Sequence, residues 1–198
     1  LARVYNKVLI RIERVSMRYV HTLWVRFQSL LVSVLPLKLA HSLLAGGLCR
    51  CACSKRGYPI TYVTAYNDTF SELGDIVTVS AKEYCFRHGY GYAFFKTPNV
   101  TGRAYVWTKI LVLYDVCRSL KHDNDAWVLW VDADACIVSP EFDPVRQIIR
   151  QKPHGTEIII AKDINGINLG VMLLKNTPFV RTLLRKIWSM RVCLGHCW

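Results

Sequence analysis

The run from Ala126 to Val131 (AWVLWV) constrains the fold more than any other part of this sequence. Six consecutive apolar residues without polar alternation are typical of a strand that is covered on both faces, as in the parallel sheets of α/β proteins. Such a sheet needs helices on both sides, and the sequence supplies helical segments in alternation with further apolar segments. We therefore expect an α/β domain in which residues 126–131 form a central strand.

Strand and helix patterns alternate from residue 58 to residue 192. The predicted strands, besides the central one, are Ile60–Ala65, Tyr92–Phe95, Glu157–Ala161 and Leu169–Leu174. The first predicted helix ends at His88, and the later ones are Ala104–Leu120, Pro144–Arg150 and Pro178–Met190. Thr69 with Glu72 has the spacing of a capping box, and Gly89 is typical of a helix end. Asp143 and Thr177 are the predicted caps of the last two helices, each followed by Pro. This order predicts a three-layer α/β/α sandwich with a mainly parallel sheet.

Two carboxylates, Asp132 and Asp134, directly follow the central strand. Ligands of open α/β sheets bind at the carboxyl ends of strands, so both residues lie where a site is expected. With the period of two of a strand, both side chains point to the same side. Two close carboxylates repel each other unless a cation neutralises them, and Mn²⁺ or Mg²⁺ accepts oxygen ligands and bridges to phosphate. The pair therefore predicts a metal-assisted nucleotide site.

Several segments, taken together, resemble glycosyltransferase family 34, which contains plant xylosyl- and galactosyltransferases and fungal Golgi mannosyl- and galactosyltransferases. These segments are Val63-Thr64, Ala81 to Tyr90, Trp107 to Ile110, Trp130 to Ala135 and Asn165 to Val171. The resemblance implies a GT-A-like nucleotide-diphospho-sugar transferase fold. It also implies a UDP- or GDP-sugar donor, a glycan acceptor, dependence on Mn²⁺ (or Mg²⁺) and retention of anomeric configuration.

The resemblance also implies roles for individual residues. Asp134 would ligate the metal, and Asp132 would hold the donor ribose and help to hold the ion. The other implied donor-binding residues are Val63 and Thr64 beside the nucleotide, Lys109 at the diphosphate, and Asn168 and Gly170 beside the sugar. Leu169 stands where the family has Thr, so one hydroxyl is missing. No catalytic residue is identified, and a solvated position on a helix face is an alternative for Lys109.

The end of the sequence departs from the family. An Asp-Gln segment and a late metal-binding His are not recognisable, and His196 follows the last helix too closely to be that ligand. We therefore expect a C-terminally incomplete domain over residues 58–192, followed by a tail over 193–198. Two other functions stay open. One is a catalytically silent, membrane-tethered subunit that binds nucleotide or glycan, and the other is a haloacid-dehalogenase-type phosphotransferase with Asp132 as nucleophile.

Residues 1–57 are predicted to form a membrane-associated appendage. Residues 1–58 hold ten Lys and Arg against one acid, whereas the remainder is nearly balanced, so the net charge of +12 does not indicate nucleic acid binding. Arg3 to Arg18 have the spacing of a basic amphipathic helix, and Phe27 to Cys49 is an apolar stretch of about spanning length. This layout predicts a type II Golgi membrane protein with a lumenal catalytic domain. A surface-bound helix, a targeting peptide and non-native sequence are the alternatives.

Some residues that resemble site residues have simpler interpretations. Cys85, Cys117 and Cys136 fall on apolar faces and are predicted to lie in the core. His88 is predicted to stabilise the end of a helix rather than to act as a base. Asp163 precedes the Asn-Gly-Ile-Asn segment and is a candidate contact to donor sugar or acceptor.

Overall fold

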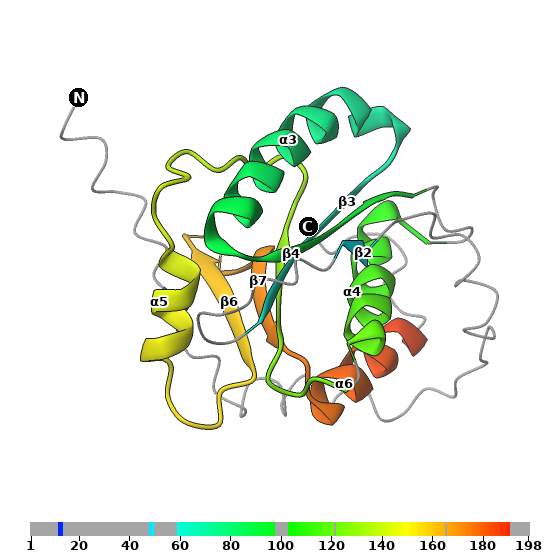
Figure 1. Cartoon of the computed structure of the whole chain (residues 1–198). Helices are drawn as coiled ribbons and strands as arrows, with labels where there is room; N and C mark the ends of the chain where they lie inside the picture. The colour runs from blue at the N-terminus through cyan, green and yellow to red at the C-terminus, as the bar shows by residue number, and fades with distance from the viewer. Residues whose placement is uncertain are drawn as a thin grey trace.

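The computed structural model describes residues 12–13, 48–49, 59–97, 103–120, 122–164 and 166–190 (Figure 1). The strands are β1 (Ile12–Glu13), β2 (Leu48–Cys49), β3 (Ile60–Tyr66), β4 (Gly91–Lys96), β5 (Trp127–Val131), β6 (Ile158–Asp163) and β7 (Gly166–Lys175). The helices are α3 (Ser71–His88), α4 (Thr108–Ser119), α5 (Pro144–Gln151) and α6 (Pro178–Ser189), with short 3₁₀ helices at Asp68–Phe70 and Tyr105–Trp107.

The strands of the described residues form one mixed sheet in the order β1-β6-β7-β5-β3-β4-β2. Strand β3 is parallel to both β4 and β5, but β7 is antiparallel to β5 and to β6. The prediction of a mainly parallel sheet is therefore wrong. The sequence predicts seven residues between β6 and β7, from the end at Ala161 to the start at Leu169. In the structure only two residues separate these two strands. Neighbouring strands with so short a connection pair as an antiparallel hairpin, because a parallel pair needs a long crossover.

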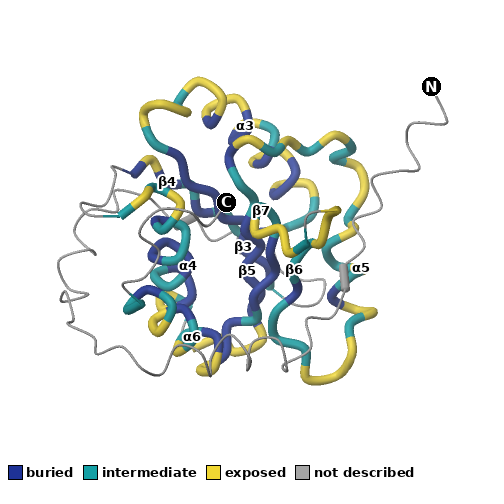
Figure 2. Tube along the Cα trace, turned by 180° about the vertical axis from the view of Figure 1, so that it is seen from behind, coloured by how far each residue is buried: buried dark blue, intermediate teal, exposed yellow. Residues whose placement is uncertain are grey.

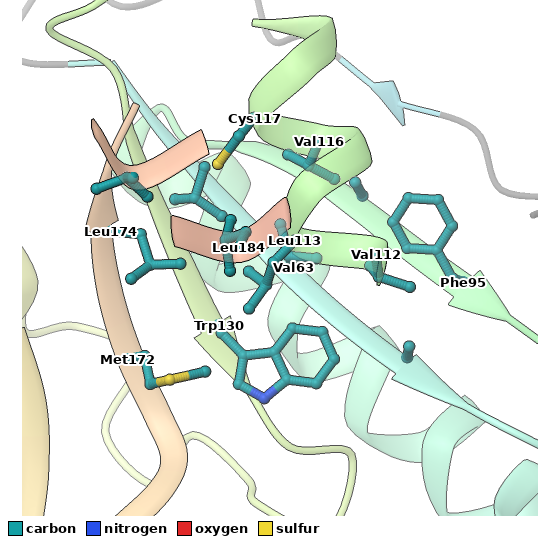
Figure 3. Close-up of a cluster of buried hydrophobic side chains, with 14 residues drawn as sticks. Val63, Phe95, Val112, Leu113, Val116, Cys117, Trp130, Met172, Leu174 and Leu184 are labelled. Carbon is teal, nitrogen blue, oxygen red and sulfur yellow. The ribbon is translucent and has the colours of Figure 1, made fainter. Parts of the chain in front are cut away.

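Helices cover both faces of the sheet, as predicted. On one face, α4 and α6 pack on the sheet in a cluster that we call the α4-side core, whose members include Val63, Val112, Leu113, Trp130, Met172 and Leu184 (Figure 3). On the other face, α3 and α5 pack on the α3-side core, whose members include Tyr62, Ala81, Tyr84, Trp127, Leu129 and Ile149. Figure 2 shows the central strands β3 and β5 as the most buried part of the chain, whereas β7 is buried only toward its carboxyl end. The predicted central strand is confirmed, because four of the five residues of β5 are buried.

The predicted helix boundaries at Gly89 and Thr177 are confirmed, and the predicted start of α3 is wrong. Gly89 ends α3 in the left-handed region with φ 66°, where glycine has no steric cost. The Thr177 side chain accepts a hydrogen bond from the Val180 amide at 3.2 Å and caps α6. Thr69 does not cap α3, which begins at Ser71 without a side-chain cap. The 3₁₀ helix Asp68–Phe70 takes up the residues of the expected capping box.

Two of the three cysteine predictions are confirmed. Cys85 and Cys117 are buried, one in each core, whereas Cys136 is exposed. Cys136 is exposed because β5 ends at Val131, so the apolar pattern continues into a loop and not along a strand.

Most of the predicted N-terminal appendage lies outside the described residues. Its two described segments are the edge strands β1 and β2, where the sequence predicts a helix and an apolar stretch. Strand β1 pairs with β6, and β2 pairs with β4. Within the described part of the chain, no helix combines the length and the hydropathy needed to cross a bilayer.

Candidate functional site

The Asp132–Ala135 segment forms a turn at the carboxyl end of β5. The Asp132 amide donates to the Gly170 carbonyl at 2.8 Å, and the Ala135 amide donates to the Asp132 carbonyl at 3.1 Å. The strand therefore ends before either aspartate. We expected both carboxylates to point to the same side because the strand would continue through Asp134. That premise is wrong, since residues 133 and 134 lie in the turn.

The Asp132 carboxylate is held by two neighbours. The indole Nε1 of Trp130 donates to Oδ1 at 2.6 Å. The ammonium of Lys109, from the first turn of α4, donates to Oδ1 at 2.9 Å and to Oδ2 at 3.2 Å. The Lys109 side chain is 15% exposed and that of Asp132 35% exposed, so the ion pair is partly shielded from water. Lys109 therefore does not occupy the solvated position that was its alternative interpretation.

Residues of strand β7 also contribute to this site. The Lys109 ammonium also donates to the Leu169 carbonyl at 3.2 Å. Asn168 Nδ2 donates to Asp163 Oδ2 at 2.9 Å, and Asn168 Oδ1 accepts from the Gly170 amide at 2.7 Å. A Cβ at Gly170 would lie 3.4 Å from Asp132 Oδ2 and 2.9 Å from Asn168 Oδ1, so a glycine lets β7 approach the carboxylate. Residues 109, 132, 168 and 170, predicted from separate segments, thus lie together.

Asp134 differs from Asp132 in its surroundings. It is exposed in the turn and has no hydrogen bond or ion pair with another described residue. In the described ranges, no group of three His, Cys, Asp or Glu side chains has the arrangement of a metal site. Among the described residues, the candidate metal ligands are the carboxylates of Asp132 and Asp134.

Val63 and Thr64 lie inside β3, three and two residues before its end at Tyr66. Both are fully buried, Val63 in the α4-side core beside Trp130, with which it is in register. The hydroxyl of Thr64 is buried and has no hydrogen-bond partner. Neither side chain reaches solvent, and the strand continues to Tyr66. The residues after β3 are closer to the edge where Asp132 lies.

A second polar cluster holds the loop that follows the aspartates. Asp143 accepts hydrogen bonds from the Tyr90 hydroxyl and from the Arg146 amide, and its carboxylate pairs with the Arg146 side chain at 3.1 Å. His88 Nε2 lies 2.8 Å from the Pro140 carbonyl. Burial, reinforced by Tyr84 and Asp143, raises the pKa of Tyr90 above its usual range. The cluster connects the turn between α3 and β4 to the start of α5. No spacing in the sequence indicates it, apart from the predicted cap at Asp143, which is confirmed.

A shallow pocket lies at the opposite, amino end of the parallel strands. It is lined by Pro59, Ile60, Thr61, Gly89, Gly91, Ser119, Leu120, His122, Asp123 and Ala126. None of the predicted site residues contributes to it. Ligands of α/β sheets bind at the carboxyl ends of strands, so we place the candidate site at Asp132 and not in this pocket.

Similar proteins support the same interpretation. An uncharacterized alpha-1,2-galactosyltransferase of Schizosaccharomyces pombe is 26% identical over an alignment that covers 67% of this chain and 44% of that protein. An alpha-1,2-galactosyltransferase of the same organism is 22% identical, with 66% of this chain and 43% of that protein covered. The chain thus spans less than half the length of these curated relatives.

The fold is similar to a solved structure. The crystal structure of a glycosyltransferase involved in the glycosylation of the major capsid of PBCV-1 superposes with a TM-score of 0.55 over 67% of each chain. Its sequence is 18% identical, so the likeness concerns the fold alone. Residues 60–153, which contain the β3–α5 segment and Asp132-Ala133-Asp134, match the model of the galactosyl transferase GMA12/MNN10 family. The predicted resemblance to glycosyltransferase family 34 is confirmed by this match and by the relatives.

Proposed function

We propose that this chain carries the donor-binding part of a GT-A-type glycosyltransferase. The reaction would move a hexosyl or pentosyl unit from a nucleotide-sugar to a glycan acceptor. The match to the family model and the alpha-1,2-galactosyltransferase relatives support the reaction class. The mixed sheet with helices on both faces, and its likeness to a solved glycosyltransferase, support the fold type.

One observation carries the proposal. Three segments that are distant in sequence, at Lys109, Asp132 and Asn168–Gly170, meet at the carboxyl end of the central strand. A charged pair at the end of a fully apolar strand is costly unless it has a function or a compensating partner. The group offers a cation, a carboxylate, an amide and a backbone carbonyl, which suit the diphosphate and hydroxyl groups of a nucleotide-sugar.

The residues present fit a hard divalent cation such as Mn²⁺ or Mg²⁺. Asp134 offers an exposed carboxylate with no described partner, and Asp132 offers a second one close by in the chain. Such ions are commonly held by one or two carboxylates, with water and phosphate oxygens completing the shell, so the lack of a third described ligand is compatible with this ion class. The ion would supply charge stabilisation for a departing nucleoside diphosphate.

The chain's own residues have distinct proposed tasks. Lys109 places a positive charge where the diphosphate would lie, and stabilises negative charge that grows as the bond to the sugar breaks. Asp132, fixed by Trp130, accepts hydrogen bonds from the ribose. Asn168 is oriented by Asp163 and by the Gly170 amide and presents its amide beside the sugar. The group that activates the acceptor is not identified among these residues.

Binding measurements on the full chain test this function. Isothermal titration with UDP, and separately with GDP, in the presence of Mn²⁺ should show binding of one nucleotide. Asp134→Ala should weaken it at least tenfold, because the exposed carboxylate is the proposed ligand. Asp125→Ala is the matched control, since this carboxylate lies at the other end of β5 and pairs with Lys175. Equal nucleotide affinity in wild type and Asp134→Ala would refute the assigned site.

Turnover of nucleotide-sugar separates the two functions that share this site. Release of UDP or GDP from the matching sugar donor supports a transferase. Nucleotide binding without turnover favours the catalytically silent subunit instead.

A type II Golgi location stays a prediction, because the segment that would anchor the chain lies mostly outside the described residues. Localisation of a tagged full-length protein tests it.

A further inference from the structure

The surroundings of Lys109 show an ammonium whose donors are all used within the protein. A lysine ammonium has three N–H groups, and here three acceptor contacts are made, two to the Asp132 carboxylate and one to the Leu169 carbonyl. The ammonium also lies 5.5 Å from the centre of the Trp130 ring, within range of a cation–π contact. Lys109 therefore serves as an internal cation at the place where an external one is expected.

The carboxylate that Lys109 contacts is likewise occupied. Oδ1 of Asp132 accepts from both Lys109 and Trp130, and Oδ2 accepts from Lys109. Gly170 lies next to Oδ2, because a Cβ at this position would be 3.4 Å from that oxygen. A divalent ion that approached Asp132 in this arrangement would meet a like charge within hydrogen-bond distance of its ligand.

Asp134 contrasts with Asp132, because it is exposed and has no described partner. A single solvated carboxylate binds Mn²⁺ or Mg²⁺ weakly, since these ions give up their water shell reluctantly. A nucleoside diphosphate would change both conditions at once. Its negative oxygens would compete with Asp132 for the Lys109 ammonium, and they would also supply ligands to the ion.

We propose that Lys109 is an internal counter-ion that suppresses cation binding at Asp132 until a nucleoside diphosphate draws its ammonium away. The proposal rests on the donor-binding function assigned above and names how that site is regulated. Lys109 couples the two ligands, so removal of its charge strengthens cation binding in the absence of nucleotide and weakens nucleotide binding. Because coupling between two ligands is reciprocal, the effect of UDP on Mn²⁺ affinity should shrink in the same variant.

The experiment measures free Mn²⁺ by electron paramagnetic resonance in titrations of the full chain, without nucleotide, with UDP and with GDP. Lys109→Met keeps most of the side-chain length and removes the charge, and it should bind Mn²⁺ without nucleotide at least tenfold more tightly than wild type. Lys109→Arg keeps the charge and should remain within about threefold of wild type. Lys175→Met is the matched control, because Lys175 pairs with Asp125 at the far end of β7.

Two different results would overturn the counter-ion role. Equal or weaker Mn²⁺ binding by Lys109→Met, while wild type binds Mn²⁺ with UDP, removes this role and leaves the donor-binding function intact. A failure of wild type to bind Mn²⁺ with either UDP or GDP overturns the donor-binding function, and the counter-ion role with it. If circular dichroism shows that Lys109→Met is unfolded, Lys109→Gln replaces it, because its uncharged amide can still donate to Asp132. The same tenfold gain is then required.

Discussion

Replacement of Asn176 with Ala should destabilise the fold strongly, although the residue is remote from the candidate site. Asn176 is fully buried between β7 and α6. Its Nδ2 donates to the carbonyls of Leu120 and Asp123 at 2.6 and 3.0 Å, and its Oδ1 accepts from Arg181 at 3.0 Å. One side chain thus joins the end of α4 and the turn before β5 to the start of α6.

The expected magnitude follows from the groups that lose a partner. The alanine variant leaves two carbonyls and one guanidinium N–H to find other partners, at about 1 kcal/mol each for a typical intramolecular hydrogen bond. We therefore expect a loss of about 2–4 kcal/mol in the free energy of unfolding. For a domain of this size that corresponds to a fall of roughly 10 °C in Tm.

Urea unfolding followed by circular dichroism on the full chain measures this loss. Asn124→Ala is the control, because Asn124 is exposed in the turn before β5 and should change stability by less than about 0.5 kcal/mol. A second variant, Asn176→Asp, keeps the acceptor for Arg181 but turns a carboxylate oxygen toward two carbonyls, so it should be at least as destabilising. A loss below about 1 kcal/mol in Asn176→Ala would show that these contacts do not hold the segment together.

Two further predictions concern close packing and thiol chemistry. Gly74→Ala places a Cβ 2.5 Å from the Tyr66 ring, so it should lower stability by about 1–3 kcal/mol despite the better helix propensity of alanine, and an unchanged or higher Tm would contradict this packing. In native protein at pH 8, peptide-level mapping should find Cys136 alkylated while Cys85 and Cys117 stay protected. Burial raises the pKa of the Cys117 thiol to about 12, so its stabilising contribution is complete at neutral pH and declines as the pH rises above about 9. Alkylation of Cys117 as fast as that of Cys136 would count against this burial.

The central strand and the last helix could be predicted because their signals are local. The apolar run of β5 and the Thr177-Pro178 start of α6 each depend on a few neighbouring residues, and both were placed correctly. The same is true of Gly89, whose left-handed conformation ends α3. The start of α3 was wrong because a capping-box spacing can also occur in a 3₁₀ turn, and the sequence alone does not separate the two.

Contacts between residues that are distant in the sequence were harder to predict. Strands β6 and β7 were predicted as separate elements because polar residues at 162–168 resemble a loop, yet these residues extend the hairpin beyond β5. Tertiary pairing therefore overrode local polarity. The sequence indicated Lys109, Asp132, Asn168 and Gly170 through family resemblance. It contained no sign that Lys109 would contact Asp132 and the Leu169 carbonyl, because that contact depends on how α4 and β7 meet.

Trp130 explains why an apolar strand can end in a firmly held carboxylate. Its ring is buried in the α4-side core, with 2% of the residue exposed (Figure 3). Its Nε1 donates to Asp132. Rotation of Asp132 would therefore leave a buried N–H without a partner, which costs about 1–3 kcal/mol. Packing around the ring thus fixes the direction of the carboxylate. Substitutions that loosen this packing without contacting any ligand should disturb the site, because the orientation of Asp132 is set from within the core.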